Sequence, residues 1–512
     1  MKIFSTTQIN ITTTIAGPIA ASYLLARNYK NSGQKKASLL TKFLGYMLAL
    51  VIYICTVIIS ETVIIPTDIF KTNSLLGYVI LLSLFIFLQA LVAFLFSFKI
   101  KRTNATLIDK FSLTNSNTYS FIHTIPFILL GLTITFFLFV VGPFWFVFLA
   151  IYVLPNIYLH NRVKPIFVSK RSSQIFTFTF IVLVALFPVT EIIHHFPAYT
   201  FVEYALLVGY YYLPVMLYCF LLYIIVDGVL LLNRFVKLIP MHVLTSQKFR
   251  LILFGVILLT TSGIVIKGVY NFNHTQIQKY TIGVEKRATK MEHVRIAMAA
   301  DFHFSEITDT DFITQFIEKI NSIHPDIVLL AGDIVESDKS NAKMVFFEEQ
   351  LRKIDSKYGV YAIEGNHDIY SQKNSYHFLE NANIKIIRDT VFKIDNSFQL
   401  IGRRDRHYKN RKLVADLVAT TNDSLPVFLL DHQPYNLENS YNSTIDVQFS
   451  GHTHHGQLFP LNFITEWIYD ISWGYKKIEN THFFVTCGAQ GWGPQVKTGS
   501  QSEIIQVDID FL

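Results

Sequence analysis

The sequence predicts two structural classes in one chain, a multi-span α-helical membrane domain followed by an α/β domain. Residues 1–270 are long apolar runs separated by short basic stretches, and charged residues are spread throughout only from about residue 285 onward. Of the 512 residues, 51% are hydrophobic and 16% are charged, whereas soluble domains carry roughly 25% charged residues. From residue 293, short apolar runs end in polar residues, as buried strands do where they meet loops.

We therefore expect an N-terminal transmembrane module of unassigned role over 1–142, further transmembrane helices over 143–270, a tether over 271–292 and a folded domain over 293–512. About eight stretches are long and apolar enough to cross a hydrocarbon core of about 30 Å. They lie near residues 9–26, 43–65, 76–98, 121–141, 143–160, 174–194, 204–232 and 249–267. The first is the weakest, because it is rich in threonine and contains a Gly-Pro pair, and a re-entrant segment is the alternative there.

Basic residues decide the expected orientation. Arginine and lysine gather in four loops, at residues 27–42, 99–120, 161–173 and 233–250. The intervening loops 66–75 and 195–203 hold one basic residue between them, Lys71. Because loops rich in Lys and Arg stay in the cytoplasm, the last span should run outward and place the C-terminal domain outside the cytoplasm at the plasma membrane. These loops explain the net charge of +7, so it does not indicate a nucleic-acid partner.

The domain begins with alternating strands and helices. The segment "HVRIAMAADFH" predicts a buried strand over 294–300, "PDIVLLAGDIVE" a second strand and "YGVYAIEGNHD" a third, with amphipathic stretches over 309–323 and 341–355 between them. This β-α-β-α-β order implies parallel strands whose carboxyl ends meet at one edge, where the ligand sites of such sheets form. Two further segments, "VFLLDHQP" and "DVQFSGHTHHG", also predict strands that end in polar residues.

Carboxylate, amide and imidazole side chains, the types that serve as metal ligands or catalytic groups, follow each of these strands. In chain order they are Asp301, His303, Asp333, Asn366, His367, Asp368, His432, His452 and His454. Any one of these motifs alone would more commonly be a turn or a surface group, but a structural role does not explain the ordered set. Mixed carboxylate, amide and imidazole ligands suit Mn²⁺, Fe, Zn²⁺ or Co²⁺ better than Ca²⁺. Two such ions about 3.5–4 Å apart can clamp both oxygens of an in-line displacement at phosphorus.

The ordered motifs "DFH", "GD", "GNHD", a lone histidine at 432 and "GHTH" resemble the signature of the calcineurin-like metallophosphoesterases. The resemblance covers about residues 293–512, and the closing segment 488–509 resembles the bacterial membrane-anchored branch similar to YkuE. It implies a four-layer β-sandwich flanked by helices. It also implies a phosphoesterase that binds two divalent metal ions, with Mn²⁺, Zn²⁺ or Fe expected.

The same resemblance implies roles for the site residues. It assigns one metal ion to Asp301, His303, His454 and Asp333. It assigns the second ion to Asp333, Asn366, His432 and His452, so that Asp333 bridges the pair. The catalytic residues would be His367, which stabilises the phosphate or protonates the leaving oxygen, and Asp368, which orients that imidazole. A hydroxide held between the two ions would attack phosphorus in line.

Several positions depart from the family pattern or extend it. Glu336 lies in the segment after "GD", where relatives often have aspartate, and this changes the loop but no expected metal ligand. His455 extends "GHTH" to "GHTHHG"; we expect a solvent-facing or phosphate-adjacent imidazole there, with a third metal ligand as the alternative. The loop 402–408 offers three arginines to a substrate phosphate or to solvent and one aspartate near the metal ligands: Arg403, Arg404, Arg406 and Asp405.

These observations predict a membrane-anchored, dimetal-dependent hydrolase of phosphoric esters at the outer face of the plasma membrane. Because a short tether would keep the site close to lipid, lipid-linked phosphates or pyrophosphates are the expected substrates and membrane lipid is the expected partner. Two alternatives remain. A non-catalytic phosphate or metal sensor would signal through the membrane bundle. A transporter with an appended hydrolase would explain why there are more spans than anchoring requires.

Overall fold

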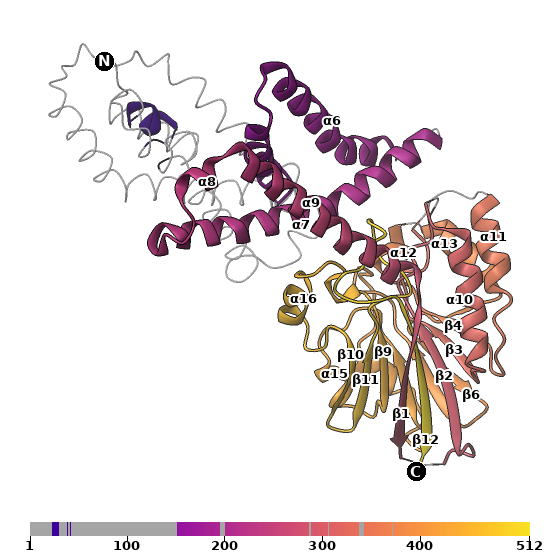
Figure 1. Cartoon of the computed structure of the whole chain (residues 1–512). Helices are drawn as coiled ribbons and strands as arrows, with labels where there is room; N and C mark the ends of the chain where they lie inside the picture. The colour runs from indigo at the N-terminus through magenta and orange to yellow at the C-terminus, as the bar shows by residue number, and fades with distance from the viewer. Residues whose placement is uncertain are drawn as a thin grey trace. The chain divides into compact units, whose positions relative to one another are not determined.

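The computed structural model describes residues 23–29, 38, 41, 151–194, 200–285, 288–305, 307–336, 342–370 and 372–512. The chain divides into two compact units, Met1–Leu154 and Pro155–Leu512, and the second unit contains every element discussed below (Figure 1). The first five expected spans lie wholly or partly outside the described residues. The last three, near 174–194, 204–232 and 249–267, lie within them.

Three long helices match those last three spans. They are α6 (Lys170–His194), α7 (Thr200–Val236) and α9 (Gln247–Asn273), and among the described residues these three are long and apolar enough to cross a membrane. Short segments connect them, η4 (Lys164–Ile166) before α6 and α8 (Met241–Thr245) before α9. The side chain of Ser246 caps α9 by accepting a hydrogen bond from the backbone N–H of Phe249 at 3.2 Å, which satisfies a donor in the first turn.

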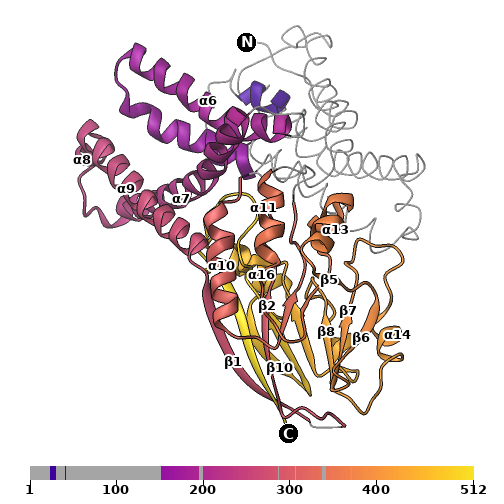
Figure 2. The ribbon, with the colours of Figure 1, turned by 90° about the vertical axis from the view of Figure 1, so that its right-hand side faces the viewer.

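The C-terminal domain is built on two six-stranded sheets (Figures 1 and 2). The first has the order β1-β12-β2-β3-β4-β5, with β1 at Gln276–Val284, β12 at Glu503–Phe511, β2 at His293–Ala299, β3 at Ile327–Leu330, β4 at Val360–Ala362 and β5 at Lys385–Ile386. The second has the order β10-β11-β9-β8-β7-β6, with β10 at Gly474–Ile478, β11 at Thr481–Val485, β9 at Val447–Ser450, β8 at Val427–Leu430, β7 at Phe398–Gly402 and β6 at Thr390–Ile394. Both sheets mix parallel and antiparallel pairs.

Alternating side chains of the strands build the core. In β2, Ile296 and Met298 belong to a buried cluster that also contains Phe428 and Phe449 of the second sheet, so this cluster fills the space between the sheets. The intervening Ala297 and Ala299 pack instead with the helices α10 (Thr310–Ser322), α11 (Ala342–Leu351) and α13 (Gln372–Asn381), which cover the other face of the first sheet. Strands buried on both faces read as continuous apolar runs, as "HVRIAMAA" does.

The expected β-α-β-α-β unit is confirmed. Strands β2, β3 and β4 pair in parallel, and α10 and α11 connect them. Asp309 caps α10 by accepting from the backbone N–H of Asp311 at 3.0 Å. In the second sheet β8 pairs in parallel with both β7 and β9. The carboxyl ends of the parallel strands therefore point to a common edge in each sheet.

The predicted tether is wrong for most of its length. Residues 276–284 form the edge strand β1, which pairs in parallel with β12 along its whole length. Only His274 and Thr275 separate the end of α9 from this strand. The segment "QIQKYTIGV" has few apolar residues because one side of an edge strand is open to solvent, and this made it look like a linker.

A fragment that begins at residue 285 should therefore be less stable than one that begins at residue 274. Removing β1 takes away the buried side chains of Ile282 and Val284, and at about 1.5–3 kcal/mol for each buried side chain the loss is about 3–6 kcal/mol. Urea unfolding of the two fragments, followed by circular dichroism, measures the difference. Equal free energies of unfolding would show that β1 adds nothing to the sheet.

Candidate metal centre

The predicted site residues all follow the carboxyl ends of parallel strands. Asp301 and His303 come after β2, and Asp333 comes after β3. Asn366, His367 and Asp368 begin the short helix α12 (Asn366–Tyr370) after β4. His432 follows β8, while His452 and His454 follow β9, the latter as the first residue of the 3₁₀ turn η5 (His454–Gly456). The two sheets thus contribute to one site from neighbouring edges.

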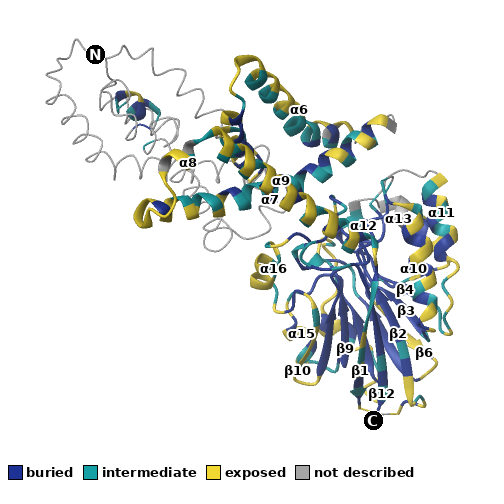
Figure 3. Cartoon of the chain, viewed as in Figure 1, coloured by how far each residue is buried: buried dark blue, intermediate teal, exposed yellow. Residues whose placement is uncertain are grey.

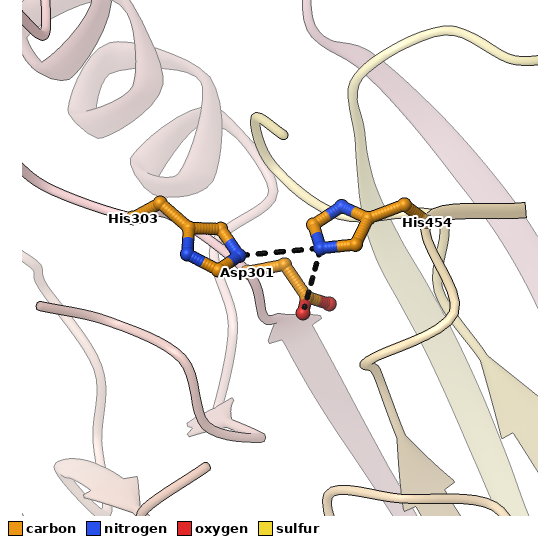
Figure 4. Close-up of side chains that lie close together, drawn as sticks. All are labelled: Asp301, His303 and His454. Carbon is orange, nitrogen blue, oxygen red and sulfur yellow. Dashed lines mark hydrogen bonds and ion pairs between the residues drawn. The ribbon is translucent and has the colours of Figure 1, made fainter. Parts of the chain in front are cut away.

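Asp301, His303 and His454 form a first ligand cluster (Figure 4). The two imidazoles face each other, with Nε2 of His303 3.2 Å from Nε2 of His454, and the latter atom lies 3.5 Å from Oδ1 of Asp301. Asp301 and His303 are buried, and His454 is nearly so. Nδ1 of His303 lies 3.2 Å from a carboxylate oxygen of Glu336, which can only accept, so the neutral imidazole presents its Nε2 lone pair to the cluster.

Asp333, His432 and His452 form a second ligand cluster. Nδ1 of His432 donates to the backbone carbonyl of Ala331 at 2.7 Å, and the neutral ring therefore carries its lone pair on Nε2. That atom lies 3.1 Å from Oδ2 of Asp333. Two lone pairs at this distance repel each other unless a proton or a metal ion lies between them, so the pair can hold either.

Asp333 connects the two clusters. Its Oδ2 lies 3.1 Å from Nε2 of His432 and 3.9 Å from Nε2 of His303. Its Oδ1 accepts a hydrogen bond from the backbone N–H of His367 at 2.8 Å, which holds the carboxylate in place. The residue that the family resemblance assigns to both metal ions is therefore the one that lies between both groups of ligands.

The backbone at the site is held in an unusual conformation. Five of the predicted ligands have positive φ: Asp301 (58°), His303 (49°), Asp333 (52°), His452 (74°) and His454 (46°). Such φ values are uncommon for residues other than glycine, and strain of this kind concentrates at functional sites. The glycines of the motifs give the carboxylates room, since a Cβ on Gly365 would lie 2.1 Å from Oδ1 of Asp333, and one on Gly451 would lie 2.5 Å from Oδ2 of Asp301.

The charges at the site favour bound cations. Burial disfavours a charged imidazole at His432, but the Asp333 carboxylate outweighs it and raises the pKa to about 10. At His303 burial is outweighed by Glu336, and the pKa rises to about 9. Burial opposes ionisation of Asp333, yet His432 holds the pKa of that carboxyl well below its usual value. Burial, and then the charge of His432, lower the pKa of His452 to about 3.

The donor set fits a pair of divalent ions. Besides the two clusters, the side-chain oxygen of Asn366 is buried without a hydrogen-bond partner in the described part of the chain. Asn366 follows Gly365 and precedes His367, two residues that contact Asp333, so this oxygen belongs to the same site. Carboxylate, amide and imidazole ligands together suit borderline divalent metals.

Metal binding should release protons. Because the pKa values of His303 (about 9) and His432 (about 10) lie above neutrality, both rings are protonated in the metal-free protein at pH 7.5 and must lose a proton to bind a metal. His452, with its lowered pKa, releases none. Metal affinity should therefore rise with pH between 6 and 8, by up to about 100-fold per pH unit for two protons.

Calorimetric titration of the metal-free protein with Mn²⁺ in two buffers of different ionisation enthalpy measures this release. The result expected is close to two protons per protein. A value near zero would mean that the two histidines are already neutral and that the ion pairs with Asp333 and Glu336 do not hold protons there.

Glu336 forms a third group of possible metal ligands with His303 and His367, a role that sequence reasoning did not predict for it. Its carboxylate lies 3.2 Å from Nδ1 of His303 and 3.2 Å from Nδ1 of His367, and it accepts from the indole N–H of Trp492 at 2.8 Å. Burial opposes its charge, but the two histidines lower its pKa to about 2. The only sequence signal was its position three residues after Asp333. The chain thus has a carboxylate that joins a metal ligand to His367.

The side chain of Asp368 accepts hydrogen bonds from backbone groups of two loops. Its carboxylate accepts from the backbone N–H groups of Ile334 at 3.0 Å, Val335 at 2.9 Å and Gly365 at 2.9 Å. It is fully buried, and burial raises its pKa to about 7. These bonds join the loop after β3 to the loop after β4, and through them they position both Asp333 and His367. The imidazole of His367 has Glu336 as its carboxylate partner.

His455 is buried, so the expected solvent-facing imidazole is wrong, while a position beside the phosphate stays a prediction. Its Nδ1 lies 2.9 Å from the hydroxyl of Ser472, its Nε2 lies 3.7 Å from Glu466, and its ring packs against Trp473 at 4.9 Å between centroids. It points toward the segment 459–473, which includes α16 (Asn462–Ile468). The extra histidine therefore connects the "GHTHHG" loop to that segment.

The arginines of the loop 402–408 differ in their surroundings. Arg403 pairs with the buried Asp431 at 3.0 Å, so its charge is already neutralised. Arg406 lies over the ring of Tyr435 at 4.1 Å. The hydroxyl of Tyr435 donates to the hydroxyl of Tyr469 at 3.0 Å, and the ring of Tyr469 is 6.2 Å from the ring of His452. Of the three, Arg406 is linked in this way to the second ligand cluster. Asp405 is buried and accepts from Gln433 at 2.7 Å.

Comparison with known proteins agrees with this geometry. Residues 294–456 match the calcineurin-like phosphoesterase family. An uncharacterized metallophosphoesterase of Campylobacter jejuni is 29% identical over 379 residues, which is 72% of this chain and 98% of that protein. This alignment is longer than the 220 residues from 293 to 512, so the similarity extends into the membrane half.

Two further relatives are shorter matches. A transmembrane protein with metallophosphoesterase domain from Bos taurus is 25% identical over 246 residues, which is 44% of this chain and 55% of that protein. The uncharacterized metallophosphoesterase YkuE of Bacillus subtilis is 25% identical over 169 residues, which is 32% of this chain and 59% of that protein. The chain spans little more than half the length of these two relatives.

Proposed function

We propose that this chain, whose residues 294–456 match the calcineurin-like phosphoesterase family, is a hydrolase that cleaves phosphoric esters with two divalent metal ions. The observation that carries the proposal is the position of Asp333 between two clusters of buried ligands. The first cluster with Asp333 would hold one ion, and the second cluster with Asn366 would hold the other. When bound, two such ions would neutralise charge on the phosphoryl oxygens and lower the pKa of the attacking water.

The chain's own residues would supply the proton transfer and the positioning. His367 is next to both clusters through its backbone bond to Asp333, and a quarter of its side chain is exposed to incoming substrate. Glu336 lies 3.2 Å from its Nδ1, and we assign Nε2 of that ring to the ester. In this arrangement Nε2 donates a hydrogen bond to a phosphoryl oxygen or a proton to the leaving oxygen. Asp368 would position His367 indirectly, because its carboxylate joins the loops after β3 and β4.

The proposed location is the outer face of the plasma membrane, in a multi-pass protein. Loop charges support the orientation, and the direct connection of α9 to β1 supports a site close to lipid. Lipid-linked phosphates or pyrophosphates are the proposed substrates on that ground. A reporter fused after Leu512 tests the side, since activity confined to the cytoplasm would reverse the orientation.

The test of the activity uses the full chain in detergent, stripped of metal and reloaded with Mn²⁺. We expect turnover of p-nitrophenyl phosphate or its bis-ester that needs added metal and stops with chelator. Protein that binds two equivalents of metal and turns over neither ester would instead fit a sensor that signals through the membrane bundle.

A further inference from the structure

A group of large apolar side chains lies exposed beside the metal centre. It consists of α16 and the residues just before it, and we call it the α16 surface: Phe459, Leu461, Phe463, Ile464, Trp467 and Ile468. None of the seven residues of α16 is buried, and the helix is drawn largely as exposed (Figure 3). The side chain of Trp467 is 86% exposed. Contiguous exposed apolar groups of this kind mark an interaction site.

The composition of the α16 surface suits a lipid bilayer. Tryptophan and phenylalanine together with isoleucine and leucine are the residues that amphipathic segments insert at the boundary between headgroups and acyl chains. Tryptophan in particular is enriched at both membrane–water interfaces. In water, exposed segments with this composition would favour aggregation.

Hydrogen bonds join the α16 surface and its neighbouring loop to the apolar helices. The hydroxyl of Tyr218, in α7, donates to the backbone carbonyl of Phe459 at 2.8 Å and also contacts the hydroxyl of Thr498. Thr498 in turn accepts from the backbone N–H of Phe459 at 2.9 Å. On α9, the carbonyl of Gly268 accepts from the backbone N–H of Lys497 at 2.9 Å. The surface is therefore continuous with the part of the chain that enters the membrane.

The distance of these contacts from the opposite ends of α7 and α9 matches the thickness of one bilayer. Tyr218 lies 18 residues before Val236 at the end of α7, which is about 27 Å along a helix axis. Gly268 lies 21 residues after Gln247 at the start of α9, which is about 32 Å. Both lengths agree with a hydrocarbon core of about 30 Å; the first half of α7, Thr200–Leu217, then lies beyond that core. If both helices cross from one membrane surface, their contacts with the domain lie at the other.

We propose that the α16 surface docks into the lipid leaflet on the side of the C-terminal domain, with Phe463 and Trp467 at the boundary between headgroups and acyl chains. The proposal rests on α7 and α9 crossing the bilayer and does not rest on the metal chemistry. The inserted segment is joined to the metal centre, since the hydroxyl of Thr453 donates to the carbonyl of Ser472 at 2.6 Å and His455 contacts the same residue. Insertion therefore sets the height of His452 and His454 above the lipid.

The test places a nitroxide at Trp467→Cys in the full chain, reconstituted into nanodiscs of phosphatidylethanolamine and phosphatidylglycerol. Collision rates with oxygen, which concentrates in lipid, and with a water-soluble nickel chelate report the surroundings of the label. The matched control is Leu413→Cys, an exposed leucine that precedes α14 (Val414–Val418) on the second sheet. The unsubstituted chain, treated with the same reagent, gives the background from Cys55, Cys219 and Cys487.

We expect the oxygen-to-nickel ratio at position 467 to be several-fold above that at position 413. A ratio equal to the control would overturn the proposal, because the label would be in water. A label shielded from both reagents would also overturn it, because protein, either residues 1–154 or a second copy, would then cover the surface. Turnover of p-nitrophenyl phosphate is recorded on the same samples; its absence in an inserted protein bears on the proposed hydrolase and not on docking.

Discussion

Replacing Asp333 with asparagine should reduce metal-dependent turnover by more than about 100-fold, the upper end of what changing a partner of a metal ligand costs. Asparagine keeps the size of the side chain but removes the charge that lies between His303 and His432 at 3.9 and 3.1 Å. Both proposed metal ions lose a ligand at once, so the metal content of the purified protein should fall together with the turnover number. Atomic emission analysis and the p-nitrophenyl phosphate assay measure the two quantities.

The matched control for this change is Asp423→Asn, which alters an exposed aspartate outside the site. It should retain the metal content and turnover of the unsubstituted chain. If Asp333→Asn bound two equivalents of metal and retained its turnover, the bridging position of this carboxylate would have no role in catalysis and the proposed arrangement would be wrong.

Replacing His367 with alanine should lower the turnover number without lowering the metal content. His367 belongs to neither the first nor the second ligand cluster, but only to the third group with His303 and Glu336, so the protein should still bind two equivalents of Mn²⁺. Turnover should fall by about 10²–10⁴-fold, the usual contribution of a positioned general acid or base. Because the group lost is the one that would protonate a leaving oxygen, the loss should be smaller for an ester whose leaving group is a weak base, such as p-nitrophenol, than for an alkyl ester.

His377→Ala is the control, since this histidine is exposed at 71% of its side chain on α13. A large fall in bound metal in His367→Ala would contradict the assignment and move His367 from catalysis to the ligand set. The same two measurements on Glu336→Gln would then show whether the His303–Glu336–His367 group binds metal by itself.

The grouping of the candidate metal ligands could be predicted because each lies in the segment that follows a parallel strand. Once "AMAADFH", "LLAGD" and "VQFSGHTH" are taken as buried strands, topology brings their ends together without knowledge of the side-chain packing. The three described apolar helices were predictable for a similar local reason, since a run of about 20 apolar residues is the length that a membrane-spanning helix requires.

The rest depended on contacts between distant segments. Glu336 acquires its role only because Trp492 and His367 come to it from two other loops, and no spacing in the sequence encodes that. His455 is buried because Ser472 and Trp473 pack against it. Strand β1 was taken for a linker because its pairing with β12 joins residues more than 200 positions apart, and local composition does not carry such pairings.

The two residues between α9 and β1 leave the C-terminal domain almost no freedom of movement relative to that helix. Backbone and side-chain bonds strengthen the connection, since Ser502 donates to the carbonyls of Asn271 at 3.1 Å and Phe272 at 2.7 Å. A domain on a flexible linker samples a volume of solution and can reach substrates at many heights. If α9 crosses a bilayer as proposed, the domain would stay at a nearly constant height and angle to the membrane. Encounter with the proposed lipid-linked substrates would then depend on their lateral diffusion and not on the reach of the protein.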